Sequence, residues 1–379
     1  MNLVALKMLF GDRAKYFGLV FAIAFASMLI AHQTSIFVGL MRRTTSQIRD
    51  VADAEVWVMD PRVQYFDENE PLTDNDLLRV RGVEGVEWAV PLAKILARAK
   101  TAEGRFQVAF LLGHDDATLV GAPRTMLLGS VADLRRPDGV IVDDVGFGFL
   151  WPGEPLALGK TLEMNDRRAV VVGICRANPP FQTVPLLYTR YSQALQYTGG
   201  ERKQMSFILA HPAPGIPEEE LARRIGEKTG LQALPRDDFA WATVRYYLTH
   251  TGIPVNFGIT IAMAFLVGIV VAGQTFYIFT IENLKQFGAL KAIGVGNGRI
   301  TAMIALQAIV VGGMGFGFGS GLAAAFFAAT QNIPHLRAFF LPWQILAGTG
   351  GAVIAIVLLA SLLSVRRVWF LEPATVFRG

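Results

Sequence analysis

The chain has 379 residues, of which 52% are hydrophobic and only 17% are charged, and its mean hydropathy is +0.40. Such a composition is too apolar for an ordinary soluble domain of this size and indicates an integral membrane protein. The formal net charge of +4 does not call for a nucleic-acid partner. Cationic residues gather at the cytoplasmic ends of membrane spans, and no nucleic-acid-binding motif accompanies the charge.

The N-terminal region predicts a cytoplasmic start and one membrane span. Residues 1–16 alternate apolar and basic side chains, which is typical of an amphipathic helix at the membrane surface. Residues 17–40 follow as an apolar run longer than the roughly 20 residues that cross a bilayer as a helix. A secretory signal peptide is the competing interpretation, but Met41-Arg42-Arg43 stands where a small-residue cleavage site would be needed. We therefore assign residues 1–41 to a lead-in helix and the first transmembrane helix.

Residues 42–251 predict a folded domain on the far side of the membrane, because they contain no further candidate span. Its one cysteine, Cys175, is the only one in the sequence, so no disulfide within the chain supports this domain. Helices are predicted at 74–80, after a cap at Thr73, and at 217–228. Strand-like runs occur at 54–59, 106–111, 139–142, 169–172 and 206–209. Because they interleave without regular βαβ spacing, we predict a large α+β extracytoplasmic domain with one or two lobes.

Residues 252–379 predict three more transmembrane helices, at 257–281, 301–330 and 343–365, so that both chain ends lie in the cytoplasm. The third span is rich in glycine. Gly313, Gly317 and Gly321 recur every four residues, with Gly315 and Gly319 between them. Small residues at this spacing let helices approach closely. We therefore expect helix packing at Gly313, Gly317 and Gly321.

The segment 282–299 is a short basic loop between the second and third of these spans. Apolar residues recur in it every three positions and form a broad helical face, and three glycines then end the helix. Short basic loops stay in the cytoplasm. From the residues alone, the loop is either an interfacial helix that only satisfies its own backbone or a docking element for a cytoplasmic motor.

The sequence predicts no catalytic, cofactor-binding or metal site. The segment from Gly153 to Thr161 has one residue too many for a phosphate-binding loop and predicts a turn before a strand. His114-Asp115-Asp116 lacks metal-ligand spacing and predicts a solvated loop. A membrane enzyme is therefore the least favoured class.

Four strongly polar side chains lie well inside the predicted spans: His32, Gln33, Gln274 and Gln307. Each either serves transport or hydrogen-bonds a neighbouring helix. No acidic or basic residue lies near the centre of a span, which argues against a proton- or ion-coupled carrier. The energy for any transport must then come from another source.

The amino-acid sequence of residues 282–294 resembles the cytoplasmic loop of FtsX/MacB-type ABC transporter permeases. Within the predicted outer domain, the strings at 60–61, 78–91, 113–121 and 133–143 resemble the DevC-type branch, and the ending 372–378 is similar to that of the family. The likeness covers essentially the whole chain.

The resemblance implies that residues 282–294 form the coupling helix that seats in the ATPase subunit. The coupling positions it implies are Glu282, Asn283, Leu284, Lys285, Phe287, Gly288, Leu290, Lys291 and Gly294. MacB carries its nucleotide-binding domain on the same chain as the permease, and this chain has none. A separate ATPase chain that binds ATP and Mg is therefore implied, and this chain is expected to be a non-catalytic subunit.

The resemblance further implies mechanotransmission, the type VII mechanism, by a homodimer in the bacterial inner membrane. Its expected partners are membrane lipid, a periplasmic adaptor of the membrane-fusion type and an outer-membrane channel, and its expected cargo is lipid, glycolipid or another hydrophobic molecule. The alternative is an FtsX-like signalling protein that regulates a cell-wall hydrolase. The predicted outer domain of about 200 residues is large for a domain that only regulates a hydrolase, which favours the exporter.

Overall fold

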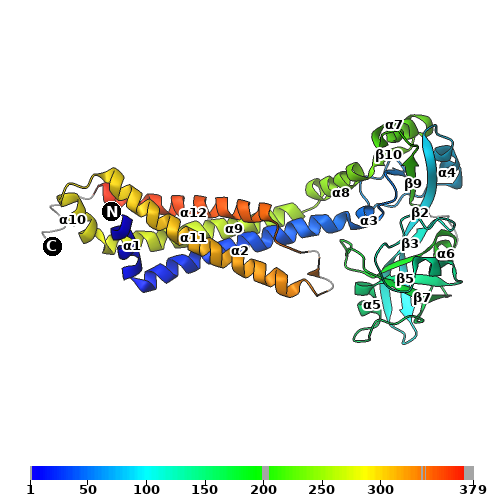
Figure 1. The fold of residues 1–379 in the computed structure, drawn as a ribbon, viewed down its shortest axis with the longest axis horizontal. Helices are drawn as coiled ribbons and strands as arrows, with labels where there is room; N and C mark the ends of the chain where they lie inside the picture. The colour runs from blue at the N-terminus through cyan, green and yellow to red at the C-terminus, as the bar shows by residue number, and fades with distance from the viewer. Residues whose placement is uncertain (1, 199–204, 334–335, 338, 371–379) are drawn as a thin grey trace. The chain divides into compact units, whose positions relative to one another are not determined.

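The computed structural model describes residues 2–198, 205–333, 336–337 and 339–370 (Figure 1). The chain divides into two compact units. A sheet domain comprises Leu40–Thr251 with Ile333–Ala338, and a helical unit comprises Met1–Gly39, Gly252–Asn332 and Phe339–Gly379. The family-like ending at 372–378 lies outside the described residues.

The sheet domain is built on one ten-stranded mixed sheet with the order β10-β1-β9-β2-β3-β8-β5-β7-β4, in which β6 pairs with β2 and β7. The strands are β1 (Val56–Met59), β2 (Val86–Thr101), β3 (Phe106–His114), β4 (Met126–Leu128), β5 (Gly139–Asp143), β6 (Thr161–Met164), β7 (Arg167–Cys175), β8 (Leu186–Arg190), β9 (Phe207–Pro212) and β10 (Gln232–Pro235). The helices are α3 (Ser46–Asp50), α4 (Asp74–Arg81), α5 (Asp144–Leu150), α6 (Tyr191–Gln196), α7 (Glu218–Thr229) and α8 (Arg236–His250), with a 3₁₀ turn η1 at Val131–Arg135.

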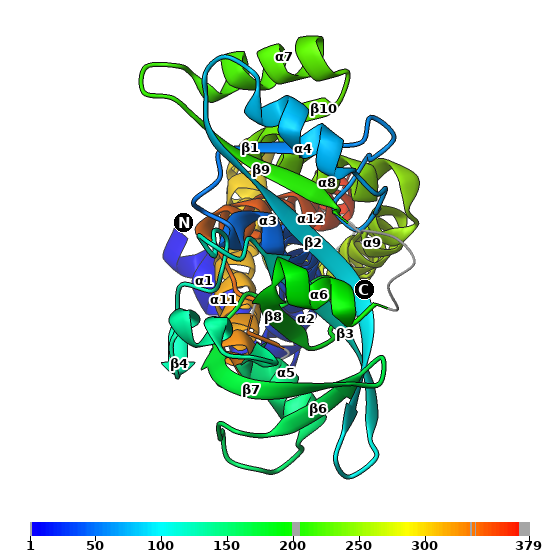
Figure 2. The same ribbon diagram turned by 90° about the vertical axis from the view of Figure 1, so that its right-hand side faces the viewer.

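The long strand β2 joins the two halves of this domain (Figure 2). One half packs α4, α7 and α8 around β1 and β9, and the other encloses β3, β5, β7 and β8. The sequence pattern does not predict β2, because its inward positions include Ala93, Ala97 and Ala99, and alanine is depleted in strands.

The predicted helices and strands of this domain are confirmed within a few residues. Thr73 caps α4 through a capping box: its Oγ1 accepts from the backbone N–H of Asp76, and Asp76 Oδ2 accepts from the backbone N–H of Thr73. Pro217 is the N-cap of α7, which carries three glutamates in its first turn. The predicted turn before a strand is also confirmed, since β6 begins at Thr161.

The prediction that His114 lies in a solvated loop is wrong. The ring is fully buried at the end of β3, stacked on Tyr188 with ring centroids 5.8 Å apart, and its Nδ1 lies 3.0 Å from the carbonyl oxygen of Val120. Burial lowers the pKa of His114 to about 4, so the ring is neutral near pH 7. The strand continues through this position, whereas Asp115 begins the solvated turn.

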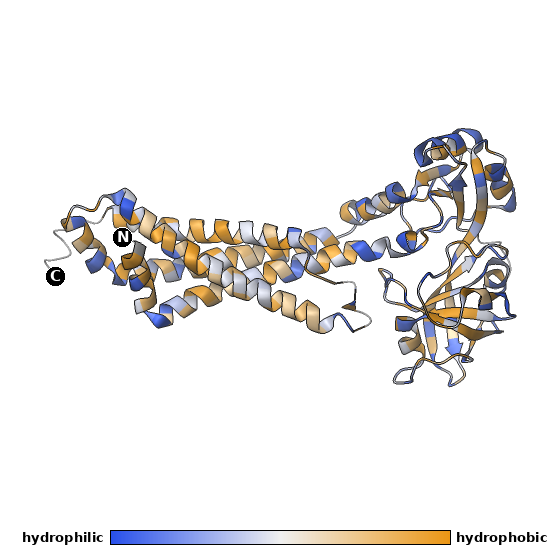
Figure 3. Cartoon of the chain, in the orientation of Figure 1, coloured by the Kyte–Doolittle hydropathy of each residue, from blue (hydrophilic) through white to orange (hydrophobic). Residues whose placement is uncertain are grey.

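The helical unit contains α1 (Asn2–Gly11), α2 (Arg13–Thr44), α9 (Ile253–Glu282), α10 (Leu284–Ala292), α11 (Asn297–Thr330) and α12 (Trp343–Trp369). As hydropathy predicts, α2, α9, α11 and α12 are long and apolar enough to cross a membrane. Apolar residues dominate these four helices in Figure 3. Each helix extends beyond its predicted span, because flanking polar residues continue the backbone hydrogen bonding.

Glycines bring α11 into close contact with α2. A Cβ atom at Gly315 would lie 2.7 Å from Ile23 Cβ, and one at Gly319 would lie 2.2 Å from the backbone oxygen of Ala24. No real side chain tolerates such distances, so these two positions require glycine if the helices are to pack this closely.

The three glycines that the four-residue spacing predicted as packing positions lie on the side of α11 that faces away from α2. Around the Cβ positions of Gly313, Gly317 and Gly321, no heavy atom from elsewhere in the described structure lies within 4 Å. Residues two apart on a helix point about 200° apart, so Gly315 and Gly319 face α2 while the other three face away. Packing within the chain therefore uses the interleaved pair rather than the predicted trio.

The polar residues of the spans differ in their surroundings. Gln307 is buried, and its Nε2 donates to the carbonyl oxygen of Ala5 in α1 at 2.8 Å, so it links two helices. His32 stacks on Phe327 and meets Phe326 edge-on, with centroid distances of 5.5 and 4.9 Å. Gln274 is exposed.

Substituting Gly319 by leucine is expected to destabilise the helical unit, because the added atoms meet the backbone of α2. Overpacking costs about 1–3 kcal/mol, which corresponds to a fall of at least about 2 °C in the thermal unfolding midpoint of the purified chain in detergent. Gly348→Leu in α12 is the matched control. No heavy atom from elsewhere in the described structure lies within 4 Å of a Cβ there, so its midpoint should stay near that of the unmodified protein. Equal midpoints for the two variants would contradict the contact between α2 and α11.

The stability of the sheet domain is expected to fall as pH rises from about 4 to about 7. Asp143 is buried, and burial raises its pKa from the ordinary 3.8 to about 7. Between these values the folded chain holds a proton that the unfolded chain has released, so folding becomes less favourable with rising pH. Asp143→Asn keeps the acceptor for the Leu186 N–H and should raise the unfolding midpoint at pH 8 but not at pH 4. Parallel pH profiles for the two proteins would exclude this role.

Candidate coupling site

The loop between α9 and α11 is a short helix with a turn at each end. Asn283 follows α9, and its side-chain amide donates to the carbonyl oxygen of Phe279 at 2.8 Å. Gly294 follows α10 with φ of +90°, a conformation that glycine adopts without strain. These two residues set the length of α10, so only Leu284–Ala292 are helical.

One face of α10 is buried against the ends of α11 and α12. The Phe287 side chain is fully buried among Ile300, Ile304 and Val368. Half-buried Leu290 packs against the same cluster, and Leu284 is also half-buried. Replacing a buried phenylalanine by alanine costs about 3–5 kcal/mol. Phe287 is therefore the main apolar anchor of α10.

Lys291 attaches α10 to the C-terminal end of α12. Its Nζ donates to the carbonyl oxygen of Val368 at 2.7 Å and to that of Trp369 at 3.1 Å. The last carbonyl groups of a helix have no partner within the helix, and a cation there also meets the negative end of the helix dipole. The Trp369 indole N–H donates to Thr301 Oγ1 at 2.8 Å, which ties α12 to α11.

An ion pair connects the end of α9 with the start of α2. Glu282, the last residue of α9, pairs with Lys15, which also binds Asp12 Oδ2 at 2.5 Å. Together with Phe287 and Lys291, this pair fastens the loop to four helices of the unit. Figure 1 shows α1 and α10 at the same end of the helical unit.

The other face of α10 is exposed. It carries Lys285, Gln286, Ala289 and Ala292, and Gly288 is buried on the inner side. Ile293 was expected on the buried apolar face, but α10 ends at Ala292 and the Ile293 side chain is 78% exposed. The exposed side of the loop thus presents a lysine, a glutamine and, just after the helix, one large apolar side chain.

The predicted coupling residues therefore divide into two groups. Phe287, Gly288, Leu290 and Lys291 hold α10 in place, whereas Lys285 is presented to the surroundings. Sequence reasoning missed the anchors Lys15 and Val368, because their contacts join segments that are far apart in the chain. The apolar repeat of the segment 282–299 includes Ile293, but the resemblance did not place this residue among the coupling positions.

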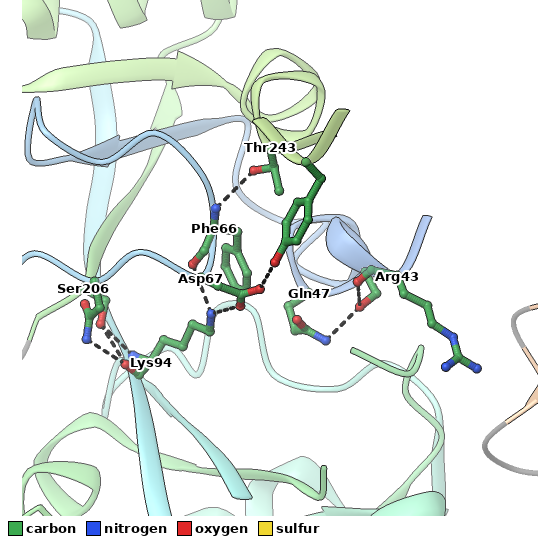
Figure 4. A network of polar contacts seen from close by, with 10 residues as sticks. Arg43, Gln47, Phe66, Asp67, Lys94, Ser206 and Thr243 are labelled. Carbon is green, nitrogen blue, oxygen red and sulfur yellow. Dashed lines mark hydrogen bonds and ion pairs between the residues drawn. The ribbon is translucent and has the colours of Figure 1, made fainter. Parts of the chain in front are cut away.

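A polar network in the sheet domain ties α8 to β2 (Figure 4). Lys94 of β2 is buried; its Nζ pairs with Asp67 and donates to the carbonyl oxygen of Phe66 at 3.0 Å. Tyr247 of α8 donates to the second oxygen of Asp67 at 2.8 Å, and Thr243 Oγ1 accepts from the Phe66 N–H at 3.2 Å. Burial lowers the pKa of Lys94, while Asp67 opposes that shift. Because α8 leads directly into α9 in sequence, this network fixes the segment that enters the membrane helix.

A second link joins the sheet domain to the connection between α11 and α12. Arg337 lies in this connection, and its guanidinium donates to both carboxylate oxygens of Asp144, at 3.2 and 2.8 Å. Bidentate pairs of this kind are geometrically specific. Since Ile333–Ala338 belongs to the sheet domain, this pair lies within that domain.

Within the described residues, no group of three or more His, Cys, Asp or Glu side chains is placed to hold a metal ion. A force applied to the exposed face of α10 would reach α11 and α12 through Phe287 and Lys291.

Comparison with known proteins gives matches over most of the chain. The model of the MacB-like periplasmic core domain matches residues 17–228, which is more than half of the chain, and that of the FtsX-like permease C-terminal region matches 258–373. Uncharacterized ABC transporter permeases of Mycobacterium tuberculosis (strain H37Rv) and Mycobacterium bovis (strain AF2122/97) are each 28% identical over 316 residues, covering 82% of this chain and 80% of theirs.

Solved structures of related outer regions also match. The periplasmic region of MacB from Actinobacillus actinomycetemcomitans is 16% identical with a TM-score of 0.39, covering 51% of this chain and 94% of that one. The extracellular domain of the transporter YknZ from Gram-positive bacteria is 17% identical with a TM-score of 0.36, covering 48% of this chain and 98% of that one. From the two family models together, the chain belongs to the FtsX/MacB family of ABC transporter permeases.

Proposed function

We propose that this chain is the membrane subunit of an exporter of the DevC type, in which a separate ATPase chain binds ATP and Mg and drives the motion. The observation that carries the proposal is α10, a helix anchored on one face and exposed on the other. In the proposed topology both chain ends and α10 lie in the cytoplasm, and the sheet domain lies in the periplasm. The proposed cargo is lipid, glycolipid or another hydrophobic molecule.

The geometry of α10 supports docking by its exposed side. Lys285 and Ile293 supply a cation and an apolar contact, and the anchors lie behind them. Phe287 contributes by seating the helix, since its side chain is inaccessible to a partner. A substitution of Phe287 would therefore test the anchoring, whereas a substitution of Ile293 tests the docking surface.

The sheet domain supports transmission of that motion. The helix α9 continues from α8, and Tyr247 of α8 holds Asp67 and, through it, Lys94 of β2. Because β2 runs through both halves of the domain, a tilt of α8 that moves β2 would displace both halves. The bidentate pair of Arg337 with Asp144 supplies a second point of transmission.

The function itself is tested by purifying the tagged chain from native membranes and identifying the proteins bound to it. An ATPase together with an adaptor of the membrane-fusion type and an outer-membrane channel would support the exporter. A cell-wall hydrolase in place of the adaptor would instead support the FtsX-like signalling function.

Ile293→Asp is expected to weaken binding of the co-purified ATPase by about tenfold, equivalent to about 1.4 kcal/mol. The reason is that a charge replaces an apolar contact on the exposed side of α10 without touching its anchors. The measurement is the affinity of the ATPase for the purified chain, with Leu158→Asp as the control. Leu158 is an exposed leucine of the sheet domain.

A cross-link provides an independent check. Cys175, the single cysteine of the sequence, is buried, so Ile293→Cys introduces an exposed thiol in a chain whose own thiol is inaccessible. A thiol-reactive cross-linker should then join this residue to the ATPase. Labelling with no attached ATPase in the assembled complex would exclude α10 as the docking element.

We also propose that two copies of the chain pair through the glycine face of α11. This face presents Gly313, Gly317 and Gly321, none of which contacts another helix of the described chain. Gly317→Leu should shift the protein from dimer to monomer on native gels while leaving its unfolding midpoint unchanged. A dimer that persists in this variant would place the contact between copies elsewhere.

A further inference from the structure

A cavity of about 240 Å³ lies in the sheet domain beside the last two turns of α8. Its polar lining comes from α8, from the segment after β1 and from the start of β10. These polar and aromatic residues are Gln64, Gln232, Arg245, Tyr246, Thr249 and His250. The cavity is open to one side and thus accessible to a ligand.

Stacked aromatic rings support one side of this cavity. The Tyr65 and Tyr246 rings are nearly parallel with centroids 3.9 Å apart, and His250 stacks on Tyr246 at 4.7 Å. Two rings cannot occupy the same face of Tyr246, so Tyr246 lies between the other two. The stack holds the His250 ring in a fixed orientation.

The hydrogen bonds of Thr249 determine which nitrogen of His250 carries a proton. The Thr249 hydroxyl donates to the carbonyl oxygen of Arg245 at 2.8 Å, and the same hydroxyl oxygen lies 2.8 Å from His250 Nδ1. Because the hydroxyl proton is already used, Nδ1 is the donor in this contact. The other ring nitrogen, Nε2, is then the one that can serve a ligand.

The charge of the site is positive. Among the described residues, Arg245 has no carboxylate within 4.0 Å, whereas the nearby acids Asp60 and Glu70 both pair with Arg62. Glu68 accepts from the Gln64 N–H at 2.7 Å. The C-terminal end of a helix carries a partial negative charge, so an anion here must be held by the side chain of Arg245.

Only a short stretch of chain separates the cavity from the membrane-spanning helix α9. His250 is three residues before Ile253, the first residue of the membrane-spanning helix α9. Three residues span at most roughly 10 Å, which is comparable to the depth of the headgroup layer on one side of a bilayer. Trp241 on α8 is 62% exposed, and tryptophan is enriched at this boundary.

We propose that this cavity binds the phosphate group of a phospholipid headgroup in the leaflet that faces the sheet domain. Arg245 supplies the guanidinium fork that matches phosphate oxygens. The Nε2 atom of His250 and the side-chain amides of Gln64 and Gln232 can form hydrogen bonds with the polar remainder of the headgroup. Lipid binding at this site requires neither the ATPase nor transport of any cargo, so the site stands or fails independently of the proposed function.

The test uses the delipidated full chain in detergent, titrated with palmitoyl-oleoyl phosphatidylglycerol and observed by native mass spectrometry. The unmodified chain should retain one more lipid than Arg245→Ala at the same lipid concentration, with binding at this site weakened about tenfold or more by the loss of a charge-assisted contact. Arg245→Lys should retain part of the binding. Arg105→Ala, an exposed arginine at the turn between β2 and β3, should bind like the unmodified chain.

Three outcomes would overturn the proposal. Lipid retention by Arg245→Ala equal to that of the unmodified chain would remove the site, and an equal loss in Arg105→Ala would show nonspecific attraction to positive charge. Displacement of the lipid by glycerol phosphate at matching concentration would identify a site for free phosphate instead. Arg245 is exposed, so an unchanged unfolding midpoint should show that each variant is folded.

Discussion

The burial of Phe287 is the interaction on which the coupling site depends. A nine-residue helix is too short to be stable alone in water, so α10 owes its structure to the cluster that Phe287 forms with Ile300, Ile304 and Val368. Lys291 strengthens this attachment by donating to carbonyl groups at the end of α12. With one face held in this way, the opposite face can transmit a load to the spans without first unfolding.

The sheet domain contains a comparable fixed point in the buried pair of Lys94 and Asp67. Removing two charges from water costs several kcal/mol per ion, so a buried pair contributes little net stability compared with apolar residues of the same size. The pair instead fixes the position of α8 relative to β2. Lys94 of β2 and Tyr247 of α8 can both contact the Asp67 carboxylate only when the two elements lie in one arrangement. The transmission of motion proposed above would need such rigid connections more than additional stability.

The glycines on the two faces of α11 differ in their surroundings. Gly315 and Gly319 allow the backbone of α2 to approach, whereas Gly313, Gly317 and Gly321 leave the opposite face smooth. Without water to drive apolar association inside a bilayer, close packing of small residues is the main source of attraction between helices. The glycine content of this helix therefore exceeds what packing within one chain requires.

The sequence by itself determined the four long apolar helices, the α+β character of the domain between the first two, the cap at Thr73 and the helix that begins near Pro217. These features depend on hydropathy and on short-range hydrogen bonding, which are local properties. Only the tertiary structure decided that Phe287 points inward, that Ile293 points outward and that Lys94 is buried, because each depends on residues distant in the chain. The same reason explains why β2, rich in alanine, and the cavity beside Arg245 could not be predicted: their residues acquire a role only when separate segments are brought together.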